Sequence, residues 1–70
     1  MATRPYPSFL IYKDGADELR WRLQASNAKV IADSGEEYRN LADCEHGLSL
    51  VQKSGDYPTW EEEDVAAARR

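Results

Sequence analysis

The sequence is poor in cysteine, in lysine and in long hydrophobic runs, and each scarcity excludes something. Its single cysteine permits no disulfide within the chain and fits a reducing compartment. No apolar run approaches the roughly 20 residues of a membrane-spanning helix. The first residues also lack the apolar core of a signal peptide. We therefore expect a cytoplasmic protein that has no membrane partner.

Positive charge is also scarce. The chain has 9 Lys and Arg residues against 13 Asp and Glu residues, which gives a formal net charge of -4. An acidic chain is a poor default binder of nucleic acid, so the composition disfavours that partner without excluding it. The same acidic, lysine-poor composition suits a salt-rich cytoplasm, where screening weakens the repulsion between like charges.

The length of 70 residues predicts one small domain. A chain this short rarely buries enough apolar surface to offset its conformational entropy. Small domains are therefore usually stabilised by disulfides, by metals or by oligomerisation. This sequence offers no disulfide and no metal-binding motif, so its size alone predicts a homodimer.

Three segments divide the chain. Residues 1–7 contain two prolines and are expected to form an extended arm. Residues 8–55 hold a single folded unit, and residues 56–70 form an acidic tail. In the tail, Thr59 and Glu62 match a capping box and predict a short helix, with a short strand or disorder as alternatives.

Within the folded unit, alternating apolar and polar residues predict three strands, over residues 8–13, 19–25 and 29–33. The turn between the first two strands contains Gly15, which is free to take a positive φ. A tight hairpin joins the second strand to the third and makes them antiparallel.

An amphipathic helix is predicted after the strands. Asn40 is a suitable N-cap, and the helix is expected from Leu41 to Lys53. Its apolar residues lie three or four positions apart, which places them on one stripe. Tyr38 is expected to anchor the segment before the helix. The residues expected in the core or in the dimer contact are Phe9, Ile11, Tyr12, Trp21, Leu23, Ile31, Leu41, Cys44, Leu48 and Val51.

These elements predict an α+β fold. An antiparallel sheet of three or four strands packs on one helix, in the order of three strands followed by the helix. So thin a pair of layers is expected to be completed by homodimerisation.

Short stretches between Phe9 and Lys53 carry a family resemblance by their order and spacing. They are Phe9, Tyr12-Lys13-Asp14, Arg20-Trp21-Arg22-Leu23, Asn27, Ile31-Ala32, Ser34-Gly35, Tyr38, Cys44, Gly47-Leu48 and Val51. Together they resemble the YegP-like family of small domains of unknown function. The resemblance implies three antiparallel strands on one helix, with two such units associating as tandem repeats or as a homodimer. Because this chain holds one unit, a homodimer is implied.

The chain departs from the family pattern at two positions. Such domains often have Asn-Gly at the hairpin, where this chain has Asn27-Ala28, and glycine is common where Glu37 stands. Alanine at positive φ costs about 1 kcal/mol or more, so a turn wider than two residues is an alternative. The resemblance supplies no established reaction.

One strand face suggests a ligand. Arg20 and Arg22 project from the same face of the second strand, and Lys13 and Lys29 are expected near it. Guanidinium groups bind phosphate or carboxylate in a bidentate manner, so these four are candidate anion-binding residues. The competing interpretation is a solvated face whose charges pair with carboxylates across the sheet. Those carboxylates are Glu18, Asp33 and Glu36.

The remaining candidates favour structure over chemistry. Trp21 alternates with arginines and therefore points into the core rather than toward a nucleobase. Tyr12 keeps two alternatives, burial in the dimer contact or an exposed hydroxyl. Cys44 and His46 diverge on the helix and cannot share a metal ion or form a nucleophile pair. We therefore assign no catalytic, metal-binding or cofactor-binding residue.

The predicted function is a non-enzymatic, homodimeric binding or interaction module. The alternative is a nucleic-acid or anionic-ligand binder that uses Arg20 and Arg22. A small enzyme with its site at the dimer contact is a third, less favoured class, because such a site needs convergent polar groups.

Overall fold

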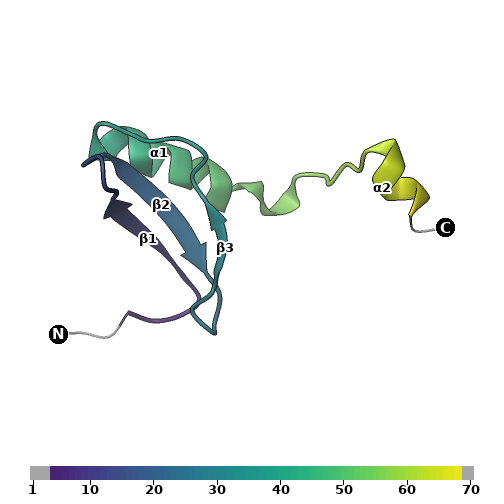
Figure 1. Ribbon diagram of the computed structural model, residues 1–70, viewed down its shortest axis with the longest axis horizontal. Coiled ribbons are helices and arrows are strands. Elements are labelled where there is room, and N and C mark those ends of the chain that lie inside the picture. Colours follow the sequence, from purple (N-terminus) through teal and green to yellow (C-terminus); the bar gives the residue numbers. More distant parts are fainter. Residues whose placement is uncertain (1–3, 69–70) are drawn as a thin grey trace.

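The chain folds in the predicted order of three strands followed by a helix (Figure 1). A computed structural model describes residues 4–68, so the first three residues of the predicted arm lie outside the described part. The sheet is antiparallel with strand order β1-β2-β3, and α1 lies against one face. The elements are β1 (Ser8–Lys13), β2 (Leu19–Gln24), β3 (Val30–Asp33), α1 (Leu41–Gln52), η1 (Ser54–Asp56) and α2 (Glu63–Ala67).

The strand register assigns side chains to the two faces of the sheet. Residues opposite one another in an antiparallel pair share a face. Trp21 lies opposite Ile11 and packs edge-on against Phe9, with 6.1 Å between the ring centroids. These residues lie on the face covered by α1. The face opposite α1, called the open face below, carries Ser8, Leu10, Tyr12, Arg20, Arg22, Gln24, Val30 and Asp33.

The hydrophobic core of the described chain is thin. Trp21 and Cys44 are the apolar residues of residues 4–68 that are buried. Most other predicted core residues are half-buried, and two are exposed: Ile31 is 62% exposed and Leu41 is 51% exposed. Ile31 is exposed because the register shifts beside Leu23 and leaves it without a partner on β2, in a β-bulge. The buried apolar residues of one chain therefore form a small cluster between β2 and α1.

Both hairpins use the same three-residue loop. In the first, the Asp14 N–H donates to the Glu18 carbonyl, and in the second the Ala25 N–H donates to the Lys29 carbonyl. Such loops combine a type I turn with a last residue at positive φ. That residue is Asp17 in the first hairpin (φ 63°), so the expectation that Gly15 takes the positive φ is wrong. In the second hairpin it is Ala28 (φ 68°), which confirms the wider turn.

The chain between β3 and α1 continues beside β2 without forming a fourth strand. Ser34 exchanges hydrogen bonds with Trp21, through its N–H and its hydroxyl. Four residues later, Tyr38 exchanges two backbone hydrogen bonds with Leu19. Residues 35–37 lie between these two contacts, where β2 has the single residue Arg20, so the segment bulges there. The sheet of the described chain therefore has three strands, extended by one isolated bridge.

The ends of α1 follow the sequence prediction, whereas the start of α2 does not. Asn40 caps α1 by accepting a hydrogen bond from the Asp43 N–H at 2.9 Å. The capping box predicted at Thr59 is wrong, because α2 begins at Glu63 and Glu62 caps it without a side-chain hydrogen bond.

The segment after η1 leads away from the sheet and gives the molecule a long axis of 49 Å (Figure 1). Its Trp60 side chain is 88% exposed. None of the helices within residues 4–68 has the length and apolar character that crossing a bilayer requires.

Candidate functional site

The open face is the candidate site, because β2 aims Arg20 and Arg22 there from alternate positions. The two residues lie about 7 Å apart along the strand. Tyr12 lies opposite Arg20 in the register, so it belongs to the open face and not to the core beneath α1. The contacts of each arginine decide whether its guanidinium group can still bind a ligand.

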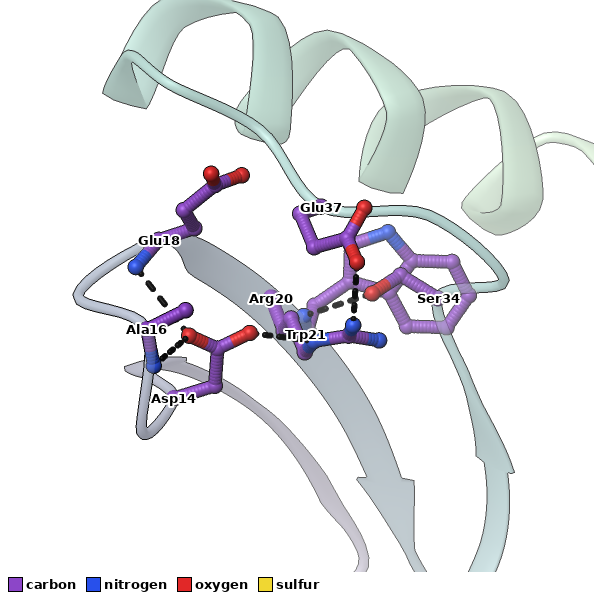
Figure 2. Close-up of polar contacts among 7 residues, drawn as sticks. All are labelled: Asp14, Ala16, Glu18, Arg20, Trp21, Ser34 and Glu37. Carbon is purple, nitrogen blue, oxygen red and sulfur yellow. Dashed lines mark hydrogen bonds and ion pairs between the residues drawn. The ribbon is translucent and has the colours of Figure 1, made fainter.

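Two carboxylates already occupy Arg20 (Figure 2). The Arg20 Nε donates to Asp14 Oδ2 at 2.7 Å, and its Nη2 donates to Glu37 Oε1 at 2.8 Å. Glu37 reaches the arginine from the loop that bulges between β3 and α1. Pairing with carboxylates was the competing interpretation of this face, but the partners are not the predicted Glu18, Asp33 or Glu36. Arg20 is therefore a structural ion-pair residue more than a free anion ligand.

Asp14 ties this ion pair to the first hairpin. Its Oδ1 accepts hydrogen bonds from the backbone N–H groups of Ala16 at 2.9 Å and Glu18 at 3.1 Å (Figure 2). The hydrogen bond from Arg20, followed by the one from Glu18, holds the pKa of Asp14 below its ordinary value. The same contact with Asp14 raises the pKa of Arg20. The carboxylate thus joins the loop, β2 and the segment before α1.

Arg22 has a different environment. Its guanidinium carbon lies 4.0 Å from the centroid of the Tyr12 ring, in a cation–π contact. Asp33 lies opposite it in the strand register, yet none of the ion pairs within residues 4–68 involves Arg22. The Nε atom is shielded from solvent and has no hydrogen-bond partner in the described chain. Arg22 therefore contacts an aromatic ring in place of a carboxylate, although Asp33 lies across from it on the open face.

A second arginine shares this character. Arg4 lies over the Tyr6 ring, with 4.6 Å between the guanidinium carbon and the ring centroid, and its Nη2 donates to Gln24 Oε1. Its Nε and the Ser8 hydroxyl are also buried without a partner among the described residues. Arg4 was not predicted, because an arm has no periodicity from which the direction of a side chain follows. Ser8 and Gln24 could have been found from the strand alternation that found Arg22.

The two candidate lysines do not join these arginines. Lys13 lies opposite Leu19, which places it on the other face of the sheet, and its Nζ lies 3.4 Å from Asp17 Oδ1 in an exposed pair. Lys29 follows the second hairpin and is exposed, without an ion pair in the part of the chain that the structure covers. The four predicted anion-binding residues are therefore not one cluster.

The described residues do not form a metal centre or enclose a cavity. Cys44 is fully buried, and burial raises the pKa of its thiol, whereas His46 is exposed on the same helix. Burial also raises the pKa of Tyr38, with a contribution from the nearby Glu36 carboxylate. Cys44 and Tyr38 are thus held in their neutral forms within the packing between β2 and α1.

Comparison with known proteins identifies the family. Residues 14–62 match the model of DUF1508, a domain of unknown function. The chain belongs to the DUF1508 family. This confirms the resemblance to YegP-like small domains of unknown function.

The DUF1508 assignment is supported by relatives whose alignment with this chain covers most of their own length. A UPF0339 protein of Neisseria meningitidis serogroup B is 44% identical over 46 residues, which cover 66% of this chain and 80% of the relative. A UPF0339 protein of Treponema denticola is 46% identical over 46 residues, covering 66% and 78%. The NMR solution structure of a protein from Haloferax volcanii superposes with a TM-score of 0.71 at 34% identity, covering 79% of this chain and 93% of that one.

Proposed function

We propose that this DUF1508 chain is a non-enzymatic, homodimeric interaction module of the cytoplasm, in which a second copy covers the apolar residues that one chain leaves exposed on β3 and on the segment after η1. The observation that carries the proposal is Trp60, which is 88% exposed on a segment that leads away from the sheet. Large aromatic side chains contribute most to association when they are buried at an interface. A Trp residue this exposed is therefore a strong candidate for an intermolecular contact.

The outer strand supports the same proposal. Val30 and Ile31 of β3 are both at least half exposed, and β3 is an edge strand whose outer side pairs with no other strand of residues 4–68. An exposed apolar edge strand is either protected or used for association. The thin core between β2 and α1 adds a need for further apolar burial, since a domain of this size is marginal by itself.

The polar groups of the first hairpin support an interaction module over an enzyme. The charged groups of Arg20, Asp14 and Glu37 pair with one another, so their charges are used to fix the fold. A catalytic role would instead need titratable groups that converge on a substrate.

The mass of the protein in solution, measured by analytical ultracentrifugation over a wide concentration range, tests the proposal. The wild-type protein is expected at twice the chain mass of 8.0 kDa. Trp60→Ala and Ile31→Lys should each shift the population toward the single chain at concentrations where the wild type is dimeric. Leu50→Ala is the matched control, because Leu50 is exposed on the side of α1 that faces away from Cys44.

The circular dichroism spectrum of each variant shows whether it still folds. A wild-type chain that remains at 8.0 kDa at millimolar concentration would overturn the proposal. So would folded Trp60→Ala and Ile31→Lys variants that dimerise as tightly as the Leu50→Ala control.

A further inference from the structure

From the open face we infer that this chain binds single-stranded nucleic acid, with Arg22 and Arg4 contacting phosphates and the Tyr12–Arg22 stack supporting a base. The inference goes beyond the proposed function and does not depend on dimerisation. It changes the residue set that the sequence suggested, because Arg20 is held in ion pairs with two carboxylates and Arg4 joins Arg22.

The charged groups of the open face differ in whether they are paired. The net charge of the chain is -4. Two carboxylates beside this face, Asp14 and Glu37, pair with Arg20, and a third, Asp33, lies opposite Arg22 in the strand register. Four further acidic residues stand in succession at 61–64, in the segment that leads away from the sheet (Figure 1). Arg22 and Arg4 are therefore the arginines of this face that form none of the ion pairs within residues 4–68, and a phosphate group responds to such local charges.

Aromatic contacts restrict the guanidinium groups of Arg22 and Arg4. Arg22 lies over Tyr12 and Arg4 lies over Tyr6, so each guanidinium group packs against an aromatic ring. A side chain that is already ordered loses less conformational entropy when it binds. The Nε atom of each arginine is shielded from solvent. The remaining N–H groups of Arg22 take part in none of the ion pairs within residues 4–68, so they are the groups that would donate to the oxygens of an anion.

Arg4 and Arg22 are spaced along β2. Arg4 donates to Gln24, which lies two residues from Arg22 on the same face of β2. Gln24, which holds Arg4, and Arg22 are therefore about 7 Å apart along β2. This separation suits successive phosphates of an extended single strand, and a strand laid along β2 would meet both cations in turn.

The stacked rings favour nucleic acid over an acidic peptide. Unstacked bases bind on the planes of aromatic side chains and of Arg guanidinium groups, and open sheet faces commonly provide such planes. An acidic peptide would use the two positive charges but has no flat group for the Tyr12–Arg22 stack. Duplex nucleic acid is disfavoured, because its bases are not available to stack on a side chain.

The test is a fluorescence anisotropy titration of the full chain with a labelled deoxythymidine oligomer of about 12 nucleotides, at about 50 mM and about 200 mM salt. The wild type should bind more tightly at the lower salt concentration. Arg4→Gln combined with Arg22→Gln should weaken binding at least tenfold and flatten the dependence of log affinity on log salt by roughly 1.4, the value for two phosphate contacts to a single strand. Lys13→Gln is the matched control, since it removes one positive charge from the opposite face and should change affinity less than twofold.

A second variant separates charge from stacking. Arg22→Lys keeps the positive charge but loses the planar group, so it should retain most of the salt dependence and lose about tenfold in affinity. It also keeps the inference testable if Arg22→Gln fails to fold, which the thermal unfolding curve of each variant reports. Perturbation of the Arg22 Nε resonance by NMR should locate the oligomer on the open face.

Three results would overturn the inference: absence of binding at the lower salt concentration, binding that the double variant leaves unchanged, and equal affinity for poly-glutamate. The last result would assign the face to acidic peptides. Sedimentation of the same samples reports the dimer independently, so failure of this inference is distinguishable from failure of the proposed function.

Discussion

Ala28 has a backbone conformation that is sterically unfavourable for a residue with a Cβ atom. Its φ of 68° lies in the left-handed region, where the Cβ of an L-residue crowds the following carbonyl. Asp17 holds the equivalent place in the first hairpin, and aspartate tolerates this region better than alanine does. The loop geometry is thus common to both hairpins, and the strain is concentrated in the second one.

Replacing Ala28 with glycine should therefore stabilise the protein. Ala28→Gly is expected to raise the free energy of unfolding by about 1 kcal/mol, because glycine takes a positive φ without the steric cost. Denaturant unfolding at fixed protein concentration measures the change. Ala16→Gly is the control, since Ala16 has no positive φ and glycine there should leave stability unchanged or lower it. A loss of stability in Ala28→Gly would contradict the strain argument.

Gly47 is required by the close approach of α1 to Tyr38. A Cβ at this position would meet the Tyr38 hydroxyl oxygen and lie 2.9 Å from the ring carbon Cζ. The substitution Gly47→Ala should therefore destabilise the protein by about 1–3 kcal/mol, although alanine ordinarily favours a helix.

Thermal and denaturant unfolding of Gly47→Ala measure that loss, and Gly55→Ala provides the comparison. A Cβ at Gly55 would meet open space, so Gly55→Ala should be close to neutral. If the two variants were equally stable, the contact between Tyr38 and α1 would not limit the packing.

At the scale of elements, the strands and α1 were predicted almost to the residue, because their signals are local. Apolar and polar residues alternate along β1 and β2, and Asn40 stands where a cap is needed. The β-bulge at Ile31 and the bridge at Tyr38 were not predicted as such. Both depend on how β3 and the following loop align with β2, and no residue pattern within either segment encodes that alignment.

The contact between the first hairpin and the segment before α1 should respond to acid. Because the pKa of Asp14 in the folded chain lies below its ordinary value of 3.8, its ion pair contributes stability above that pH. The contribution is lost as the pH falls from the ordinary value through the lower value of the folded state. We expect the stability advantage of wild type over Asp14→Asn to be full at neutral pH and to shrink in strong acid.

Unfolding free energies of both proteins between neutral pH and about pH 2.5 measure this difference. Asp17→Asn is the control, because Asp17 and Lys13 form an exposed pair at 3.4 Å that should contribute little at any pH. An advantage over Asp14→Asn that is independent of pH would show that the carboxylate charge is not what stabilises the hairpin.

At the scale of the whole molecule, the proposed dimer predicts that stability depends on concentration. The midpoint of thermal unfolding should rise with each tenfold increase in protein concentration, because association stabilises the folded chain by mass action. Trp60→Ala should lower the midpoint and weaken that dependence, whereas Leu50→Ala should preserve it. A wild-type midpoint that stays constant over two orders of magnitude in concentration would show that a single chain is stable by itself.

The candidate site was predicted only in part. Strand alternation correctly placed Arg20 and Arg22 on one face, and it correctly placed Trp21 on the other. It could not distinguish the two arginines, although one is held in ion pairs and the other lies over Tyr12. It also could not find Arg4, whose position depends on where the arm crosses the sheet.

The sequence by itself determined the secondary structure, the antiparallel order and the family, since these follow from periodicity, turn residues and caps that operate within a few residues. Only the tertiary structure decided which charges meet. The partners of Arg20 lie 6 and 17 residues away, and they reach it because the first hairpin and the loop before α1 converge on β2. Such contacts depend on strand register and loop path, which packing sets between segments distant in the chain.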